Sequence, residues 1–482
     1  MTINSLKGKL VAVLGYGMEG KAVTAYLLKN GISPALFDNK PWEKWPKAEQ
    51  EEIKTLGLNF IFGPDCFKEL AGFNVVFRSP GIKISDISNQ ISAQTIITSQ
   101  TKWFFDHCPS KIIGVTGTKG KGTTSTLIYK ILKRGSKVQI PNSQSNQNFQ
   151  NTNPHIYLTG NIGNIQPFEI LDNLKPDDYI IYELSSFQLQ DLHTSPHIAV
   201  VLMTTSEHLD YHKNLAEYVE AKSAITKFQN PDDFAIINAD FPSSVSIGKQ
   251  GQGQKLFFSR KKDLETGVFF KDDKIVVKNV LGQNLQLTTY NLQLKGQHNL
   301  ENICASALVA NCLNIDNATI IHVINNFKGL EHRLEFVAEK HGIKFYNDSF
   351  STTPETAIAG ISSFTEPLIV ILGGSRKNSD FSELGKVINE SKTIKAVILV
   401  GQEAKKIKDA VLSVVFPPFL KGGQEGLKIF EQAKTMKEIF EQINSVAESG
   451  DVVLLSPACA SFDMFKNYKD RGEQFKEWVN LW

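Results

Sequence analysis

The sequence predicts an α/β fold with mostly parallel sheets, divided into three domains. Two observations lead to this prediction. Short apolar runs typical of buried strands alternate with helical patterns along almost the whole chain. The chain also has 482 residues, a length that corresponds to two to four ordinary domains.

The N-terminal domain, residues 1–108, is predicted to be Rossmann-like. The apolar run LVAVLG (10–15) leads into a glycine turn and a helix, and a second run, SPALFD, ends at Asp38. A third strand, NVVFRSPGI (74–82), runs into a Pro-Gly turn. Strands followed by turns and helices in this order favour a parallel, doubly wound sheet.

The first glycine turn matches the dinucleotide-binding pattern G-x-G-x-x-G at Gly15, Gly17 and Gly20, with Asp38 further along the chain. Taken alone, this pattern predicts NAD and an oxidoreductase. A single short motif is weak support, so NAD binding is only an alternative interpretation.

The central domain, residues 109–329, is predicted to hold a parallel sheet like that of P-loop ATPases. It opens with the buried strand KIIGV, the glycine-rich loop GVTGTKGKGTTS (114–125) and a helix. Further buried strands are expected at YIIYELSS (179–186), IAVVLMT (198–204) and DFAIINAD (233–240).

The C-terminal domain, residues 330–482, is predicted to be Rossmann-like again. Its expected strands are KFYND (344–348), LIVILGG (368–374), AVILVG (396–401) and DVVLLSP (451–457). Three polar or Pro- and Gly-rich stretches lack the periodicity needed to join a core and are predicted to be surface insertions: residues 139–155, 243–255 and 416–426.

The composition indicates a globular protein of a reducing compartment. The formal net charge of +2, from 52 basic and 50 acidic residues, gives no electrostatic case for nucleic-acid binding. The five cysteines form no CxxC pair, which predicts free thiols. No apolar run approaches the ~18 residues of a membrane span, and no signal-peptide pattern is present. We therefore expect a cytoplasmic protein without membrane insertion, and nothing in the sequence requires more than a monomer.

The glycine-rich loop of the central domain is predicted to bind phosphate. Gly117, Gly120 and Gly122 allow the backbone to approach phosphate oxygens, and N–H groups at the start of the next helix face the anion. Lys121 supplies positive charge. The loop departs from the common pattern because Gly122 stands where a Mg²⁺-binding hydroxyl is expected. Two hydroxyls, of Thr123 and Thr124, follow at once.

Polar side chains end two of the predicted central strands. Glu183 stands at the carboxyl end of one strand, where open sheets bind ligands, and a carboxylate suits Mg²⁺. His208 follows the next strand, although a single histidine is more often structural. Lys222, on the helix beyond, is interpreted from its position alone as a solvated charge.

These motifs resemble the Mur ligases and the folylpolyglutamate synthases, which are ATP-dependent amide-bond ligases. The loop T-G-T-x-G-K-G-T carries the resemblance, although Gly after the Lys is more familiar in the folylpolyglutamate branch. Further segments match the family in order: GNIG (160–163), GQHNLEN (296–302), LEHRLE (330–335), NDSFSTTPE (347–355) and SPACASFDMFKNYKDRG (456–472). In the Mur family the helical lysine at the position of Lys222 is carbamylated and helps to bind a second metal ion.

The resemblance implies a set of functional residues. The implied catalytic residues are Lys121, Glu183, His208, Lys222 and Asn161. The implied ATP site comprises Gly117, Thr118, Lys119, Gly120, Lys121, Gly122, Thr123, Thr124, His298, Asn299, Asn302, Arg333 and Asp348. The implied ligands of two Mg²⁺ ions are Thr123, Glu183, His208 and carbamylated Lys222.

Within the family, the RSPGI and SPACASFD segments look most like the branch that adds D-glutamate to UDP-N-acetylmuramoyl-L-alanine. The implied site for the UDP substrate comprises Gly15, Tyr16, Gly17, Asp38, Ser79, Gly81 and Asn161. The implied D-glutamate site comprises Thr352, Lys377, Ser461 and Tyr468. Three positions depart from the family: Glu207 replaces Asp, Tyr468 replaces Phe, and Phe350 stands where relatives often have Lys.

The resemblance therefore implies an ATP-dependent ligase that works through an acyl phosphate in cytoplasmic peptidoglycan precursor synthesis. Two alternatives remain besides the oxidoreductase. One is another ligase of the Mur or folylpolyglutamate type. The other is a nucleotide-binding relative without catalysis, which only Gly122 and Phe350 favour.

Overall fold

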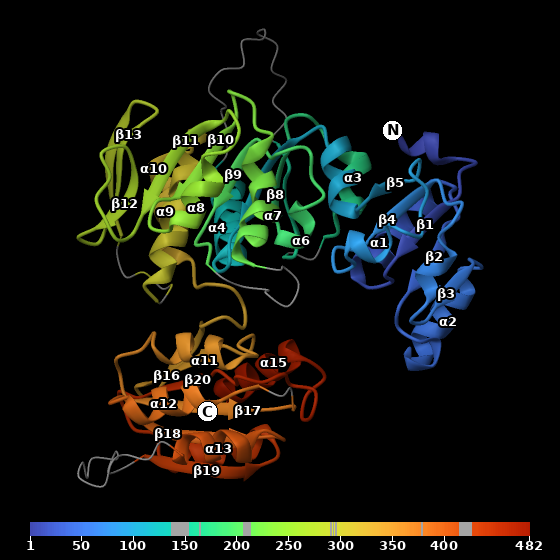
Figure 1. Cartoon of the computed structure of the whole chain (residues 1–482). Coiled ribbons are helices and arrows are strands. Elements are labelled where there is room, and N and C mark those ends of the chain that lie inside the picture. The colour runs from blue at the N-terminus through green and yellow to red at the C-terminus, as the bar shows by residue number, and fades with distance from the viewer. Residues whose placement is uncertain are drawn as a thin grey trace. The chain divides into compact units, whose positions relative to one another are not determined.

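The protein is built around three β-sheets, each flanked by helices (Figure 1). The computed structural model describes residues 1–135, 154–162, 165–205, 214–289, 292, 294, 296–376, 379–413 and 427–482. The chain forms two compact units. The first comprises Met1–Tyr290 and Leu300–Ile324, and the second comprises Asn291–Asn299 and Asn325–Trp482.

The first sheet, at the N-terminus, has five parallel strands in the order β3-β2-β1-β4-β5. Its strands are β1 (Val11–Leu14), β2 (Ala35–Asp38), β3 (Phe60–Phe62), β4 (Val75–Arg78) and β5 (Ile96–Thr98). The helices around it are α1 (Met18–Lys29), α2 (Lys47–Thr55) and α3 (Gln100–His107). This order of parallel strands is that of a Rossmann fold, as the sequence predicted.

The second sheet lies in the same unit and has nine strands in the order β14-β13-β12-β11-β10-β9-β6-β8-β7. Its parallel strands are β6 (Lys111–Thr116), β7 (Ile156–Gly160), β8 (Tyr179–Glu183), β9 (Ile198–Val201), β10 (Phe234–Asn238), β11 (Gln254–Ser259) and β12 (Gly267–Lys271). Two antiparallel strands, β13 (Lys274–Val280) and β14 (Gln283–Thr288), complete one edge.

The helices of this region are α4 (Lys121–Arg134), α5 (Pro167–Ile170), α6 (Ser186–Leu189), α7 (Leu215–Lys227), α8 (Pro242–Gly248), α9 (His298–Cys312) and α10 (Asn317–Asn326). In Figure 1 the labels β8 to β11 lie among the labels of helices α4 and α6 to α10. Strand β6 pairs with both β8 and β9, so their carboxyl ends meet at one edge of the sheet. Open α/β sheets bind ligands at such an edge.

The third sheet, in the second unit, has the order β15-β16-β20-β17-β18-β19 and is parallel except for β15. Its strands are β15 (Glu335–Lys340), β16 (Ile343–Asn347), β17 (Leu368–Gly373), β18 (Ile394–Val400), β19 (Lys428–Ala433) and β20 (Val452–Leu455). Its helices are α11 (Pro354–Ile361), α12 (Ser382–Glu390), α13 (Ala404–Leu412), α14 (Met436–Asn444) and α15 (Tyr468–Leu481).

The third sheet is buried on both faces, which explains why its central strands are continuous apolar runs. Along β17, Leu368, Val370 and Leu372 enter one core, and Ile369 and Ile371 enter another on the opposite face. Alternation of side chains across the sheet therefore places every residue of such a run in a core. The predicted α/β class with mainly parallel sheets in three regions is confirmed.

The prediction that residues 243–255 form an insertion outside the core is wrong. Most of the first half of this stretch lies in α8, where Ser244 and Ile247 are fully buried. Ser244 Oγ donates to Leu202 O at 2.8 Å and accepts from the Thr204 N–H at 3.1 Å. The polar composition concealed a helix whose buried serine is satisfied by the backbone after β9. The predicted insertions 139–155 and 416–426 fall largely or wholly outside the described residues.

The cysteines and the lengths of the helices bear on two further expectations. All five cysteines lie in the described part of the chain and are unpaired, so the prediction of free thiols is confirmed. Among the helices of the described residues, none is long and apolar enough to cross a membrane.

Candidate functional site

The predicted phosphate loop connects β6 to α4 at the edge where β6, β8 and β9 end. Gly120 is the N-cap of α4 and has φ +88°, a left-handed conformation that favours glycine. A Cβ on Gly120 would lie 2.3 Å from Asn302 Oδ1. The same oxygen accepts from Thr124 Oγ1 at 3.1 Å. The loop and Asn302, both predicted to contact ATP, are therefore in contact.

The two threonine hydroxyls after Gly122 have different surroundings. Thr124 is fully buried and its hydroxyl is engaged by Asn302. Thr123 is half-buried, on the first turn of α4. Of the two hydroxyls that could replace the missing one, that of Thr123 is closer to the surface.

The beginning of the loop is fixed to the segment that follows β9. The Thr118 N–H donates to Met203 O at 2.7 Å, and Thr118 Oγ1 donates to Thr205 O at 3.0 Å. Thr205 precedes residues 206–213, which are outside the described residues and contain the predicted ligand His208 and its neighbour Glu207.

Lys121 folds back over the loop. Its Nζ donates to Gly117 O and Thr118 O, both at 3.0 Å. Lys121 also lines a cleft together with Gly15 and Ser79. The ammonium is therefore held beside the backbone N–H groups that begin α4, where it adds to their attraction for an anion.

Lys222 is not a solvated charge, which corrects the interpretation from its sequence position alone. Only 1% of the residue is exposed. Its Nζ donates to Thr116 Oγ1 at 3.1 Å and Gly117 O at 3.3 Å, and lies 4.8 Å from the ring centroid of Tyr218. Helix α7 thus delivers a buried amine to the end of β6, beneath the phosphate loop.

Glu183 and Asn161 meet at the ends of neighbouring strands. Glu183 is the last residue of β8 and is 7% exposed. It lies opposite Val115 of β6 and Gly160 of β7. The Asn161 N–H donates to Glu183 O at 3.3 Å. The Glu183 carboxylate and the Thr123 hydroxyl are oxygen ligands of the kind that Mg²⁺ prefers. The chemistry of these two residues therefore fits a Mg²⁺ ion.

A cleft of about 500 Å³ joins the predicted UDP site to the predicted catalytic residues. Its lining includes Gly15, Gly17, Ser79, Lys121, Asn161 and Phe187. The first three come from turns that follow strands of the first sheet, and the others come from loops and helices that follow strands of the second sheet. The structure therefore brings together residues that the sequence assigned to two different sites.

The other residues predicted for the UDP substrate shape the first turn. The Tyr16 N–H donates to Asp38 Oδ2 at 2.7 Å, and the Lys40 N–H donates to Asp38 Oδ1 at 2.8 Å. Burial raises the pKa of Tyr16 to about 12. A Cβ on Gly20 would lie 1.9 Å from Gly15 O, so close packing requires that glycine. Gly81 lies in an exposed turn with open space around it.

In the second unit, Asp348 is a buried hydrogen-bond acceptor. It is 5% exposed. Its Oδ1 accepts from the Leu334 N–H at 3.1 Å, and its Oδ2 accepts from Ser456 Oγ at 2.7 Å and from the Ser351 hydroxyl. Burial raises the pKa of Asp348 to about 6, although these hydrogen bonds and Arg333 lower it.

Two aromatic residues that the sequence analysis singled out pack together in the second unit. Phe350 and Tyr468 form an edge-to-face pair with centroids 5.0 Å apart, and Arg333 lies over the Phe350 ring. Thr352 is half-buried and Ser461 is 2% exposed. The predicted ligand Lys377 is outside the described residues.

The two remaining residues predicted for ATP lie at the start of α9. His298 is exposed and Asn299 is 5% exposed.

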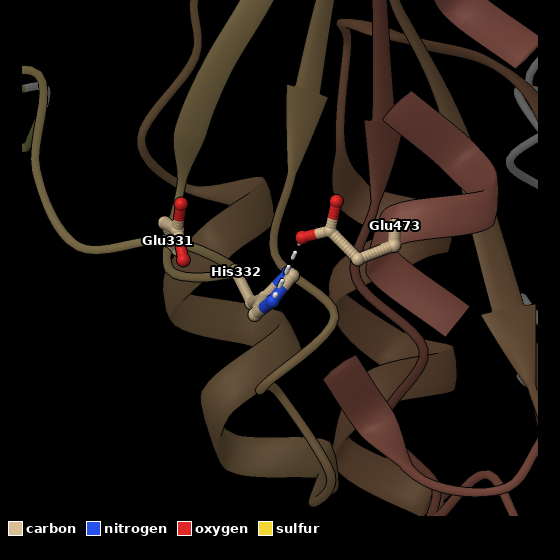
Figure 2. A group of neighbouring side chains, drawn as sticks. All are labelled: Glu331, His332 and Glu473. Atoms are coloured by element: carbon tan, nitrogen blue, oxygen red, sulfur yellow. Dashed lines mark ion pairs between the residues drawn. The ribbon is translucent and has the colours of Figure 1, made fainter. Parts of the chain in front are cut away.

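A second group of potential metal ligands lies beside Arg333. Glu331, His332 and Glu473 bring ligand atoms within 4.8 Å of one another, and Figure 2 shows Glu473 reaching the His332 ring. His332 Nδ1, however, lies 2.9 Å from Asn347 Nδ2. Lys476 Nζ lies 2.9 Å from Glu473 Oε1 and 3.9 Å from Glu331 Oε1. Lys476 thus pairs with both carboxylates, and the group forms part of an ion-pair network.

Sequence reasoning missed two buried arginines. Arg471 is 2% exposed, and it donates to Ser349 Oγ and O, both at 2.9 Å, and to Cys459 O at 3.1 Å. Arg78 is 1% exposed and forms an ion pair with Asp191. Both stand inside segments that the sequence singled out, but only their burial distinguishes them from surface charges.

The chain is similar to known ligases over nearly its whole length. Residues 115–310 match the Mur ligase middle domain, and residues 332–459 match the Mur ligase glutamate ligase domain. A UDP-N-acetylmuramoylalanine–D-glutamate ligase of Acetivibrio thermocellus is 37% identical over 98% of this chain and 97% of its own length. An enzyme of the same name from Clostridium novyi is 35% identical over the same shares of the two chains.

Solved structures agree on the fold. The crystal structure of the UDP-N-acetylmuramate–alanine ligase of Thermotoga maritima matches with a TM-score of 0.56. It is 17% identical and covers 98% of this chain and 99% of its own. At this identity the likeness concerns the fold alone.

Proposed function

This chain belongs to the Mur ligase family, in the branch of the UDP-N-acetylmuramoylalanine–D-glutamate ligases, and we propose that it catalyses that branch's reaction. The reaction is the ATP-dependent addition of D-glutamate to UDP-N-acetylmuramoyl-L-alanine in peptidoglycan precursor synthesis. One observation supports it most directly. Gly15, Gly17 and Ser79 line the same cleft as Lys121 and Asn161, so a nucleotide sugar at the first turns could extend to the glycine-rich loop.

The proposed reaction has two steps. The carboxylate of UDP-N-acetylmuramoyl-L-alanine attacks the γ-phosphorus of ATP, the bond to ADP breaks, and an acyl phosphate forms. The amine of D-glutamate then attacks the acyl carbon, loses a proton, and phosphate leaves. In the first step Lys121 and the N–H groups at the start of α4 hold the phosphates, so positioning and charge stabilisation provide most of the catalysis.

Mg²⁺ when bound neutralises phosphate charge beside Glu183 and Thr123. We assign Thr123 this role because the hydroxyl of Thr124 is buried against Asn302. Asn161 lines the cleft, and we propose that it contacts the acyl group of the substrate. A second ion, held by His208 and carbamylated Lys222, is part of the proposal. The position of the buried Lys222 amine next to the loop supports it, because carbamylation there would provide an anionic oxygen ligand of the kind that Mg²⁺ prefers.

We also propose which ligand each region of the chain binds. Residues 1–108 bind the UDP moiety and residues 109–329 bind ATP and Mg²⁺. Residues 330–482 supply D-glutamate contacts from Thr352, Lys377, Ser461 and Tyr468. His298, Asn299, Asn302, Arg333 and Asp348 complete the ATP site. We propose a cytoplasmic monomer.

The test is phosphate release by the purified protein with Mg²⁺-ATP, UDP-N-acetylmuramoyl-L-alanine and a panel of D- and L-amino acids. We expect release that requires D-glutamate, with a matching mass gain of the UDP substrate. Release with another amino acid would assign the chain to a different ligase activity. ATP binding without release in any combination would favour the non-catalytic alternative.

Lys121→Ala tests the role of the loop. We expect kcat to fall by at least about 100-fold, as for the loss of one charge-stabilising group. Lys133→Ala removes an exposed lysine from the same helix and should leave activity unchanged. Near-normal turnover in Lys121→Ala, with thermal unfolding unchanged, would contradict the proposed phosphate role.

A further inference from the structure

Two contacts, from α1 and β4 of the N-terminal region, reach one short segment that follows β8, residues 185–191, which we call the junction segment. Glu19 Oε1 accepts from Gln188 Nε2 at 2.9 Å. Arg78 Nη2 forms an ion pair with Asp191 Oδ2, and the two side chains are 0% and 6% exposed. The junction segment begins two residues after Glu183, so it links the end of β8 to the turns that line the cleft.

Arg78 shapes one of these turns. Its Nη1 donates to Ser79 O at 3.3 Å, to Pro80 O at 3.2 Å and to Ile82 O. Ser79 and Pro80 line the cleft. Because Asp191 fixes the guanidinium that binds these carbonyls, the place of the turn depends on the junction segment.

Gln188 fixes the other turn. It belongs to a capping box at the start of α6, in which its Oε1 accepts from the Ser185 N–H at 3.0 Å. A backbone N–H only donates, so the amide oxygen of Gln188 faces Ser185 and its NH₂ group faces Glu19. Glu19 follows Gly17 on the first turn of α1. The beginning of α1 is therefore tied to the same segment as the Ser79 turn.

The cleft is lined from both sides of this junction. Ser185 and Phe187 of the junction segment line it, as do Glu19 from α1 and Lys121 from the start of α4. A ligand that fills the cleft contacts both sheets at once. Its reactive end reaches the loop correctly only when the spacing between the sheets is correct, and small misplacements are costly in catalysis.

Given the function proposed above, we propose that Gln188 and Asp191 are positioning residues that set the spacing between the nucleotide-sugar turns and the phosphate loop. They act through Glu19 and Arg78. A ligand that contacts one sheet alone, such as UDP or ATP, does not depend on this spacing. The full substrate, which spans the cleft, does.

The main test is Gln188→Glu. This variant keeps the oxygen that accepts from Ser185 and keeps the side-chain size, but it sets a carboxylate against that of Glu19. We expect kcat/KM for UDP-N-acetylmuramoyl-L-alanine to fall by at least about tenfold, since misplacement on the ångström scale can cost more than this. The Kd of UDP, measured by calorimetry, and the KM of ATP should stay unchanged.

A rescue separates positioning from other effects. Combining Glu19→Gln with Gln188→Glu exchanges donor and acceptor and restores one hydrogen bond between the two positions. We expect this double variant to recover most of the lost kcat/KM.

The ion pair provides a second test. Asp191→Asn would leave the Arg78 charge buried without its carboxylate, which destabilises folding. The double variant Arg78→Met with Asp191→Leu avoids that buried charge, and we expect it to fold but lose kcat/KM for the full substrate. Asp172→Asn is the matched control. Asp172 also joins the two sheets, accepting from Lys29 Nζ at 2.7 Å and Tyr26 OH at 3.3 Å, but lies away from the cleft lining.

Three results would overturn the positioning role: normal kcat/KM in Gln188→Glu, equal losses for UDP and the full substrate, or no recovery in the exchanged double variant. These differ from a failure of the proposed function, in which the wild-type protein itself would not turn over UDP-N-acetylmuramoyl-L-alanine.

Discussion

The guanidinium of Arg333 lies over the ring of Phe350, with 3.9 Å between Cζ and the ring centroid. Tyr468 meets the same ring edge-on. Phe350 is 39% exposed, so its ring provides an accessible aromatic face that holds the positive charge of Arg333.

The first prediction concerns this stack. Phe350→Leu removes the ring face, and an exposed cation–π contact is worth about 0.5–1 kcal/mol. If Arg333 contacts ATP as proposed, KM for ATP should rise by about 2- to 5-fold, which is this energy expressed as a ratio. Phe350→Tyr keeps the ring and should keep the wild-type KM. Equal KM values in both variants would show that the stack does not position Arg333.

The second prediction concerns the pH dependence of stability. The pKa of Asp348 is raised by burial from 3.8 to about 6. The folded state therefore retains a proton that the unfolded state has lost, and stability falls as pH rises through this window. Asp348→Asn removes this dependence. Between about pH 4.5 and 7, the wild-type protein should lose about 2 kcal/mol more unfolding free energy than the variant.

Urea unfolding at both pH values measures this difference. Asp232→Asn, an exposed aspartate of the first unit, is the control and should follow the wild-type protein. A parallel pH dependence of wild type and Asp348→Asn would mean that Asp348 is ionised in the folded state at both pH values.

The third prediction concerns Lys222. Because its amine is buried at the end of β6, Lys222→Ala should abolish most activity, and a short carboxylic acid should restore part of it if a carbamate acts there. Mass spectrometry of the intact protein under CO₂ should detect the carbamate directly. Lys227→Ala removes an exposed lysine of the same helix and should have wild-type activity. High activity of Lys222→Ala in CO₂-depleted buffer would exclude a carbamate role.

The fourth prediction concerns the phosphate loop. Gly120→Ala adds a Cβ 2.3 Å from Asn302 Oδ1 at a left-handed position, so the loop must shift. We expect weaker ATP binding together with a loss of about 1–3 kcal/mol of unfolding free energy, the range for such backbone strain. Gly57 also has a left-handed φ, +64°, but open space around it. Gly57→Ala therefore measures the conformational cost of alanine at such a φ without the clash that occurs at Gly120. Equal ATP affinity in both variants would contradict a close fit at Gly120.

The sequence alone identified the class of fold and most of the buried strands. Runs such as 368–374 are apolar at every position, and a run of this kind fits a strand buried on both faces. The glycine-rich loop at 114–125 could also be predicted from the sequence, because its glycines stand between a strand pattern and a helix pattern. Such local patterns are sufficient wherever one segment carries the whole signal.

Local patterns failed where a residue's role depends on distant neighbours. The stretch 243–255 reads as polar, yet Ser244 is buried because backbone groups after β9 satisfy its hydroxyl. Lys222 reads as a surface charge, yet α7 carries its amine to Thr116. In both cases a polar group is stable in the interior only because a partner from another element reaches it.

By itself, the sequence determined the α/β class with three sheets, the glycine-rich loop between a strand and a helix, and the family of ligases to which this chain belongs. The tertiary structure alone decided which of these parts meet. It joined Gly15 and Ser79 to Lys121 in one cleft, and it tied that cleft to β8 through Gln188 and Asp191. The physical reason is that hydrogen bonds and ion pairs between segments far apart in the chain depend on how the sheets pack, and no local pattern of residues encodes that packing.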